Sequence, residues 1–372
     1  MISNRAGSIA VLAAFAFGLV VSLAIRPAGT SSTVGDRDDE PRAGAVPVRI
    51  DWRVPLSVPT SMPGLGDNPK YLRQALIDSS AGAIQLNLFD PGEVVPAFGI
   101  TDAVRDGKVQ AGYTWLGYDQ GKTPASALLA AVPFGMEPME FSAWWFEAGG
   151  RELGEKLYER YNARPILCGM TGPETAGWFR ERIESLDTLK GMKIRFAGIG
   201  GKVIARLGAS VTMIPGGEIY QALEKGAIDA SEFSLPVVDQ ALGFNRIAKF
   251  NYFPGWHQPA TATHLIVNLD TWRSLSTSDR ALVELACSAS VTRNLSKTEA
   301  QQGAVIAGFP AQGVSAETLP EEVLRALEAV TEEILAEEAG EDPVFAEILS
   351  SQRVFRAEYA QWKQRAYLPR DF

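Results

Sequence analysis

Residues 192–211 read MKIRFAGIGGKVIARLGASV. β-prone residues lead into a cluster of glycines and a stretch with helical spacing follows, which predicts a strand, a tight turn and a helix. Dinucleotide-binding turns share this order, but Val203 stands where their third glycine or an alanine is needed for close packing. Glu218 lies at the distance of the ribose-binding acid, yet it begins a new helix, where acids are common for electrostatic reasons. The sequence therefore disfavours a nucleotide cofactor.

Arg195 lies at the carboxyl end of the predicted strand, directly before the glycines. In open α/β sheets, ligands bind at that edge of the sheet. A guanidinium group can hold a carboxylate through two parallel hydrogen bonds, which a lysine cannot do. We therefore expect Arg195 to bind the carboxylate of a ligand. The alternative interpretation is a structural ion pair with a nearby acid.

Three further segments carry polar candidates in predicted loops. Glu174 lies in TGPETAGWF, where Pro173 predicts the first turn of a helix over 173–183. Glu232 ends a short predicted strand, and Gln258 follows a Pro-Gly turn in YFPGWHQPA. Oxygen atoms that converge from separate loops suit a hard cation such as Na⁺ or Ca²⁺. Each acid alone is explained by capping or surface exposure, so the prediction of a site depends on the set.

The whole chain sets broad limits on function. It has 372 residues, a net charge of −9 and 46% hydrophobic residues, which suits one large α/β unit or two lobes and argues against nucleic acid as a partner. Its two histidines are His257 and His264, and it contains no HExxH, GxSxG, Walker or CxxC motif. We predict no catalytic residue and no enzymatic activity.

The N-terminal segment predicts export. An apolar run over 7–25 lies between Arg5 and Arg26, which is typical of a signal peptide cleaved after Ala24 or of an uncleaved membrane anchor. No cysteine stands directly after the run, which excludes a lipoprotein. Residues 26–46 are polar and rich in Pro, Gly and Asp, as in a disordered linker. Both alternatives place the folded part in the periplasm, either free or membrane-anchored.

Strand-like and helix-like segments alternate between residues 48 and 269, which predicts largely parallel sheets in two α/β lobes. The remainder is mostly helical, over roughly 275–305, 318–339 and 342–366. Cys168 and Cys287 are the only cysteines. An exported protein permits a disulfide between them, and two buried free thiols are the other possibility.

The sequence resembles a known family at these residues: the periplasmic substrate-binding proteins of tripartite ATP-independent periplasmic (TRAP) transporters. It is most similar to the branch that binds 2-oxo acids and lactate-like monocarboxylates. The resemblance covers about 45–370. The matching stretches are PGEVVPAFGITDAVRDGKVQAGYT, TGPETAGWFR, GMKIRFAGIGGKVIARLGAS, GGEIYQALEKGAIDASEF, LGFNRIAKFNYFPGW and HLIVNLDTW.

The resemblance implies a two-lobe periplasmic binding protein fold with crossing strands, a long connecting helix and extra C-terminal helices. Lobe 1 would comprise 47–165 with a returning part about 257–305, lobe 2 would comprise 166–256, and the helices of 306–372 would pack on both lobes. The ligand would be a small monocarboxylate, held between the lobes and delivered to the small and large membrane subunits of the transporter. The C-terminal helices would either mediate a homodimer or pack on a monomer.

The resemblance also implies roles for individual residues. Arg195 would clamp the substrate carboxylate, and a bridging Na⁺ or Ca²⁺ would be held by Glu174, Glu232, the Phe233 carbonyl and Gln258. Glu174, Phe233 and His257 would also contact the substrate, as would Trp115 and Tyr118 from the other lobe.

Several positions depart from the family pattern. Glu174 stands where the branch usually has Gln, and Gln258 stands where it usually has Glu. Phe233 and His257 replace tryptophans, and the histidine adds a polar donor, which implies room for a more polar or larger acid.

Two other functions remain open. One is a membrane-anchored sensor domain with the same fold. The other is an exported enzyme in which Glu174 or Glu232 acts as a general base.

Overall fold

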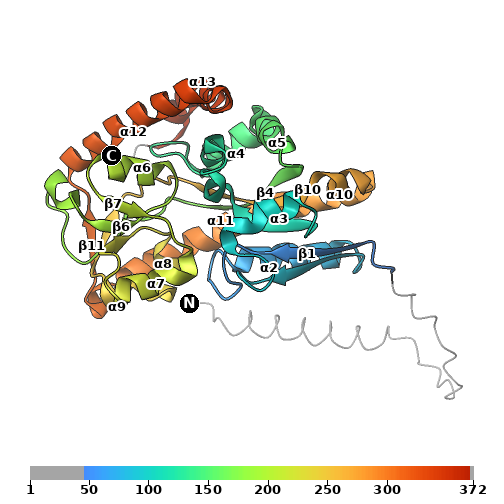
Figure 1. Ribbon diagram of the computed structural model, residues 1–372, viewed down its shortest axis with the longest axis horizontal. Helices are drawn as coiled ribbons and strands as arrows, with labels where there is room; N and C mark the ends of the chain where they lie inside the picture. The colour runs from blue at the N-terminus through green and yellow to red at the C-terminus, as the bar shows by residue number, and fades with distance from the viewer. Residues whose placement is uncertain (1–45, 369–372) are drawn as a thin grey trace, which may run out of the picture. The chain divides into compact units, whose positions relative to one another are not determined.

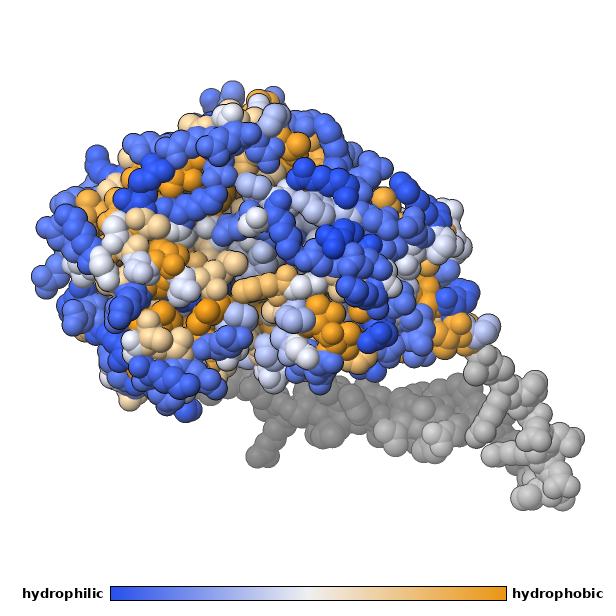
Figure 2. Space-filling model, viewed as in Figure 1, coloured by the Kyte–Doolittle hydropathy of each residue, from blue (hydrophilic) through white to orange (hydrophobic). Residues whose placement is uncertain are grey.

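The computed structural model describes residues 46–368. The expected signal peptide or anchor and the expected linker up to residue 45 lie outside this range, as do residues 369–372. Among the described helices, none is both long enough and apolar enough to cross a membrane. Hydrophilic side chains cover most of the face shown in Figure 2, interrupted by hydrophobic patches.

The first lobe is built on two small sheets (Figure 1). β1 and β2 pair in parallel, and β10 lies between β3 and β4, antiparallel to both. The strands are β1 (Ile50–Pro55), β2 (Ile84–Phe89), β3 (Ala111–Trp115), β4 (Ala163–Thr171) and β10 (Thr261–Asn268). The helices of this lobe are α2 (Asp67–Ser79), α3 (Ile100–Arg105), α4 (Pro138–Glu147), α5 (Gly150–Glu159) and α10 (Leu269–Ser274).

The second lobe contains a mixed sheet in the order β11-β9-β5-β8-β6-β7. β6 is parallel to β7 and β8, whereas β5 is antiparallel to β8 and β9. The strands are β5 (Gly177–Phe179), β6 (Lys193–Arg195), β7 (Ser210–Thr212), β8 (Ala230–Ser231), β9 (Phe250–Phe253) and β11 (Ser315–Thr318). The helices are α6 (Gly198–Arg206), α7 (Gly216–Glu224), α8 (Pro236–Ala241) and α9 (Phe244–Ile247).

One long helix, α11 (Thr277–Ala307), connects the lobes. It packs against β4 and α2 of the first lobe and against α8 of the second. The Ser276 hydroxyl caps its N-terminus by accepting the Asp279 N–H at 3.1 Å. Cys287 of α11 forms a disulfide with Cys168 of β4, so the alternative of free thiols does not apply. The predicted long connecting helix is confirmed.

The two C-terminal helices, α12 (Glu321–Glu341) and α13 (Pro343–Ala366), pack on both lobes. α12 lies against α6 of the second lobe, and α13 lies against α4 and α5 of the first (Figure 1). The Arg206–Glu337 ion pair, at 2.7 Å, joins α6 to α12. The Gln352 amide of α13 donates to the Leu128 carbonyl at 2.7 Å. The end of the chain therefore ties the lobes together.

Two expectations about secondary structure are wrong. The helix expected over 173–183 does not form: residues 173–176 are irregular, and β5 follows between β8 and β9. Gly177 has φ +129°, which no helix allows, and Trp178 is fully buried in the sheet, so tertiary packing overrides the local signal of Pro173. The sheets are also not largely parallel, because β10 and β5 each run antiparallel to both neighbours.

Candidate functional site

The candidate site lies where the chain crosses between the lobes. The chain passes from β4 to β5 through residues 172–176, and it returns from β9 to β10 through 254–260. The two crossing segments are hydrogen-bonded to each other, since the Glu174 N–H donates to the Gln258 carbonyl at 3.1 Å. At Gly255 a side chain would meet the Glu174 carbonyl oxygen at 2.1 Å, so only glycine permits this approach.

A cavity of about 40 Å³ lies at this junction. Its volume is several times the roughly 10–15 Å³ that one water molecule needs, which suits a small ligand. It is lined by Ser57, Val58, Leu65, Tyr113, Trp115, Tyr118, Glu174, Arg195, Ala197, Phe233, Ser234, Gln258, Thr261 and Thr263.

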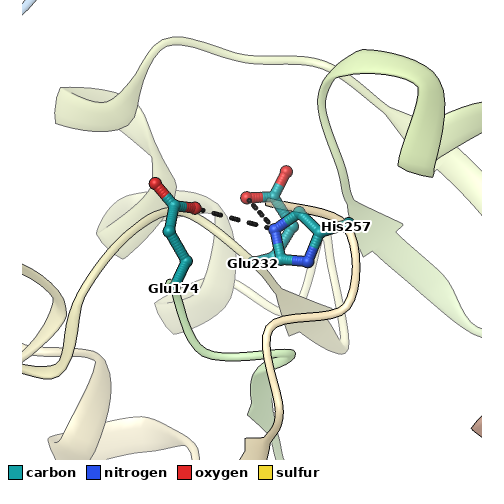
Figure 3. Close-up of side chains that lie close together, drawn as sticks. All are labelled: Glu174, Glu232 and His257. Atoms are coloured by element: carbon teal, nitrogen blue, oxygen red, sulfur yellow. Dashed lines mark ion pairs between the residues drawn. The ribbon is translucent and has the colours of Figure 1, made fainter. Parts of the chain in front are cut away.

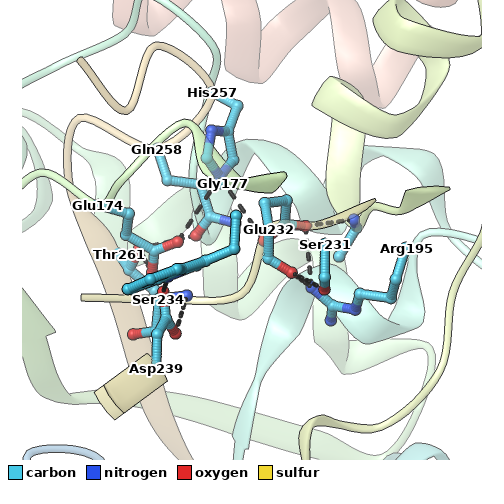
Figure 4. Close-up of polar contacts among 12 residues, drawn as sticks. Glu174, Gly177, Arg195, Ser231, Glu232, Ser234, Asp239, His257, Gln258 and Thr261 are labelled. Carbon is cyan, nitrogen blue, oxygen red and sulfur yellow. Dashed lines mark hydrogen bonds and ion pairs between the residues drawn. The ribbon is translucent and has the colours of Figure 1, made fainter. Parts of the chain in front are cut away.

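Arg195 is almost fully buried at the end of β6 and is paired with Glu232 (Figure 4). Its Nη1 donates to the Glu232 carboxylate at 2.9 Å and to the Glu232 carbonyl at 2.8 Å, and its Nε donates to the Ile214 carbonyl at 3.2 Å. The same carboxylate oxygen accepts the Ala197 N–H at 2.5 Å. The ion pair expected as an alternative is therefore present. The guanidinium still lines the cavity, with its carbon 5.3 Å from the centre of the Phe233 ring.

His257 brings two carboxylates together. Its Nε2 lies 3.6 Å from Oε2 of Glu174 and 3.6 Å from Oε2 of Glu232, and both carboxylates point at this one nitrogen in Figure 3. All three side chains are buried. Within residues 46–368, none of these three atoms has a hydrogen-bond partner. The three residues form a group that could hold a metal ion.

The three side chains of this cluster have shifted pKa values, with different causes. Burial lowers the pKa of His257, but Glu174 and Glu232 outweigh it and raise that pKa to about 9. Burial raises the pKa of Glu174, and His257 only partly offsets this effect. Burial also acts to raise the pKa of Glu232, yet Arg195 and His257 together bring it below its ordinary value. Glu232 is therefore the more strongly ionised carboxylate.

The glycines of residues 198–201 allow site side chains to come close. Gly198 turns the chain with φ +68°, and a Cβ there would lie 3.2 Å from the Trp115 ring. A Cβ at Gly200 would lie 2.8 Å from the Cβ of His257. The predicted strand, turn and helix are confirmed, with α6 beginning at the first of these glycines.

Aromatic side chains form another wall. Trp115 ends β3, Tyr118 lies in the 3₁₀ helix that follows, and their ring centres are 5.1 Å apart. Trp115 Nε1 is buried without an acceptor in the described part of the chain, so it is free to donate to a ligand. Phe233 packs so closely on Gly216 that a Cβ there would lie 2.2 Å from its ring. Its carbonyl oxygen accepts no hydrogen bond from residues 46–368.

The structure brings the nominated residues together. Trp115, Tyr118, Glu174, Arg195, Phe233 and Gln258 line the cavity, and Glu232 and His257 contact this set. The sequence reasoning missed Tyr113, Ser234, Thr261 and Thr263. Tyr113 could have been predicted from the sequence, because side chains two residues apart lie on the same face of a strand and Trp115 was already a candidate.

Thr261 supports both crossing segments. Its hydroxyl lies 2.8 Å from the Glu174 carboxylate and 2.7 Å from the Gln258 side-chain oxygen. One hydroxyl carries one proton, so it can donate to only one of these oxygens at a time.

Comparisons with known proteins agree with this architecture. The family model for bacterial extracellular solute-binding proteins, family 7, matches residues 58–342. A monocarboxylate 2-oxoacid-binding periplasmic protein of Nostoc sp. is 33% identical over 315 residues, which are 85% of this chain and 86% of the relative.

Two solved TRAP solute-binding proteins share the fold closely. The protein of Bordetella bronchiseptica, with copurified calcium and picolinate, has a TM-score of 0.84 and 31% identity over 86% of this chain and 95% of its own. The protein of Pseudoalteromonas atlantica, with bound sodium and pyruvate, has a TM-score of 0.82 and 32% identity over 85% of this chain and 97% of its own. The chain therefore belongs to family 7 of the bacterial extracellular solute-binding proteins, the TRAP solute receptors.

Proposed function

We propose that this protein is the extracytoplasmic receptor of a TRAP transporter, and that it captures a small monocarboxylate, a 2-oxo or 2-hydroxy acid, through a bound metal ion. The observation that carries the proposal is the buried Arg195 beside three possible ligand atoms, which have no hydrogen-bond partner in residues 46–368, at a small cavity between the lobes. An arginine and a metal ion together neutralise a carboxylate that enters a buried site.

The residues fit a metal ion. Oε2 of Glu174 and Oε2 of Glu232 are buried without donors in residues 46–368. Gln258 and the Phe233 carbonyl add neutral oxygens, which are ligands that Na⁺ and Ca²⁺ accept. The relatives with calcium or sodium in their structures support the same choice of ion. The ion would hold the carboxylate of the substrate against Arg195.

Further parts of the role are inferred from the family. The N-terminal segment exports the chain to the periplasm, where the loaded receptor delivers its acid to the small and large membrane subunits. No covalent chemistry is part of this role. A homodimer remains a prediction, to be tested by the molar mass of the purified protein in solution.

Thermal unfolding with a panel of acids tests the proposal. The full chain is stripped with a chelator and then unfolded with 2-oxo, 2-hydroxy and dicarboxylic acids, each with Na⁺, Ca²⁺ or no metal. A ligand at 100 times its Kd adds about 2.7 kcal/mol to the stability of the folded state. We expect this shift for short monocarboxylates, and only with a metal ion present. If no acid shifts the transition under any condition, the substrate class is wrong. If an acid disappears during incubation, the protein is an enzyme.

A further inference from the structure

A series of hydrogen bonds runs through the first lobe to the wall of the cavity. The hydroxyl of Ser290, on α11, donates to Oδ1 of Asn68 at 2.7 Å. Nδ2 of Asn68 lies 2.6 Å from the hydroxyl of Tyr113 and 2.7 Å from the carbonyl oxygen of Cys168. The Tyr113 hydroxyl lies 2.7 Å from that of Thr263, and both of these residues line the cavity. The series therefore joins the connecting helix to the place where a ligand would lie.

The backbone of β4 leaves room for these polar groups. A Cβ at Gly169 would lie 2.3 Å from both Oγ1 of Thr263 and the Tyr113 hydroxyl. It would also lie 2.5 Å from Nδ2 of Asn68. The register of β4 against β10 shifts directly after Thr263, and such bulges redirect side chains beside binding sites. The hydrogen bonds therefore require glycine at this position.

The direction of each hydrogen bond follows from the groups that cannot donate or cannot accept. A carbonyl oxygen has no proton, so the atom of Asn68 that faces Cys168 must be the amide nitrogen. An amide nitrogen accepts no hydrogen bond, so the Tyr113 oxygen accepts the second amide proton. Burial raises the pKa of Tyr113 to about 12, so its own proton is present at neutral pH. That proton is available to Thr263.

The two hydroxyls carry one proton more than they use. Tyr113 and Thr263 have one hydroxyl proton each, and the hydrogen bond between them uses only one. Within residues 46–368, the other proton has no acceptor. A phenol is the stronger donor of the two, and a phenol that already accepts a hydrogen bond donates more readily. The proton of Thr263, the less buried residue, is therefore left for a group in the cavity.

A short acid in this cavity has one oxygen to spare for that proton. Arg195 reaches the cavity from the second lobe and faces the carboxylate, whereas Thr263 belongs to β10 of the first lobe. The cavity holds only about 40 Å³, so an acid that contacts Arg195 also reaches the first-lobe wall. The remaining polar group of a 2-oxo or 2-hydroxy acid is the oxygen on its second carbon, and both forms of this oxygen accept hydrogen bonds.

We propose that Thr263 donates its hydroxyl proton to the oxygen on the second carbon of the bound acid, and that it thereby selects 2-oxo and 2-hydroxy acids over acids without this oxygen. An unsubstituted acid leaves a buried donor unpaired, which weakens its binding. Tyr113, Asn68 and Ser290 are positioning residues, because they fix the direction of the donated proton. The inference rests on the proposed function and concerns its selectivity.

Calorimetric titrations of the full-length protein with pyruvate, L-lactate and propionate test the inference at constant Ca²⁺ concentration. The readout is the ratio of pyruvate affinity to propionate affinity. A bound metal ion can also favour pyruvate, so the change in this ratio between variants reports on Thr263. In Thr263→Val, which keeps the shape and removes the hydroxyl, we expect the ratio to fall about tenfold. L-lactate should weaken as pyruvate does, and propionate should bind as before.

Two further variants serve as controls. Thr263→Ser keeps the hydroxyl and should keep most of the wild-type ratio. Thr114→Val is the matched control, because Thr114 lies beside Tyr113 in β3, points to the other face of the sheet and does not line the cavity. This control should leave the ratio unchanged. If Thr263→Val does not fold, as thermal unfolding without acid would show, Thr263→Ala takes its place with the same expected loss.

Two results would overturn the inference. An unchanged ratio in Thr263→Val would show that another group binds the oxygen on the second carbon. A reduced ratio in Trp115→Phe, with none in Thr263→Val, would assign that oxygen to the indole N–H, which also lacks an acceptor in residues 46–368. In both cases the acids still bind, so the receptor role stands. If none of the three acids binds to the wild type with any metal ion, the receptor role is wrong, and the selectivity that rests on it is wrong as well.

Discussion

The two histidines of this chain lie seven residues apart, both are buried, and their pKa values move in opposite directions. His264 lies in β10 with its ring 5.0 Å from that of Trp145, and burial alone lowers its pKa to about 3. His257 lies in the loop before β10, where two glutamates raise its pKa to about 9 despite the same burial. Burial by itself therefore marks a histidine of the core, whereas burial together with converging carboxylates marks a site.

The same contrast separates the regions around them. Around His264, strands β3, β10 and β4 form a sheet that the Cys168–Cys287 disulfide fastens to α11. Within residues 46–368, the ring nitrogens of both histidines lack hydrogen-bond partners. Only His257 has two carboxylates at 3.6 Å, and they come from irregular segments. The first region provides stability, and the second gathers charged groups that can bind a ligand.

The largest effect is expected from Arg195→Ala. It removes the cation that faces the ligand and leaves the buried Glu232 carboxylate without its ion-pair partner. We expect the affinity for the acid to fall by about 2–5 kcal/mol, measured by calorimetry at constant metal concentration. Arg195→Lys is the control, because it keeps the positive charge but loses the planar guanidinium group that makes two parallel hydrogen bonds. Wild-type affinity in the alanine variant would show that the carboxylate is bound elsewhere.

Removal of the disulfide tests whether the region around His264 contributes to stability and not to binding. The bond joins β4 to α11 across a sequence separation of 119 residues, a span that includes β5 to β9 of the second lobe. Cys168→Ala combined with Cys287→Ala should lower the free energy of unfolding by about 2–5 kcal/mol in urea titrations. The affinity of the folded variant for its acid should stay the same. A large loss of affinity at full folding would mean that the two regions are not separable.

Trp115→Phe tests whether the Trp115 side chain contacts the ligand, and a smaller effect is expected. It keeps the ring against Tyr118 and removes the buried N–H that has no acceptor in residues 46–368. The affinity for the acid should fall by about 0.5–1.5 kcal/mol, with no loss of stability. An unchanged Kd would place the ligand away from β3.

The smallest effect is a pH dependence that belongs to His264. Its folded pKa is about 3 and its ordinary value is 6.5, so the unfolded chain takes up the proton first as pH falls. The stability that this histidine contributes is present above pH 6.5 and is lost as pH falls toward 3. Between pH 6.5 and 5.5 the loss is about 1 kcal/mol.

Metal-free wild type and His264→Leu are compared in urea at both pH values, and the variant should lack this loss. His257 does not interfere, because its raised pKa places its contribution between pH 6.5 and 9. Equal pH slopes in the two proteins would show that His264 is accessible to protons.

Sequence patterns predicted those secondary-structure elements that depend on neighbouring residues alone. The strand before the glycines, the turn at Gly198 and the long helices follow from periodicity and from backbone preference. Glu174 was nominated for the site but placed on a helix, because Pro173 gives a helix signal that packing against β8 and β9 overrides. Thr261 and Ser234 carry no signal of their own, since only the crossing of the chain between the lobes brings them to the cavity.

A calorimetric titration of pyruvate into the full-length protein tests the central claim most directly. It is run with Ca²⁺ and again after chelation, because the site is held to bind a carboxylate and a metal ion together. The account predicts one pyruvate per chain in the presence of metal, and an affinity at least about tenfold weaker without it. Equal affinity with and without metal, or no binding in either case, would contradict it.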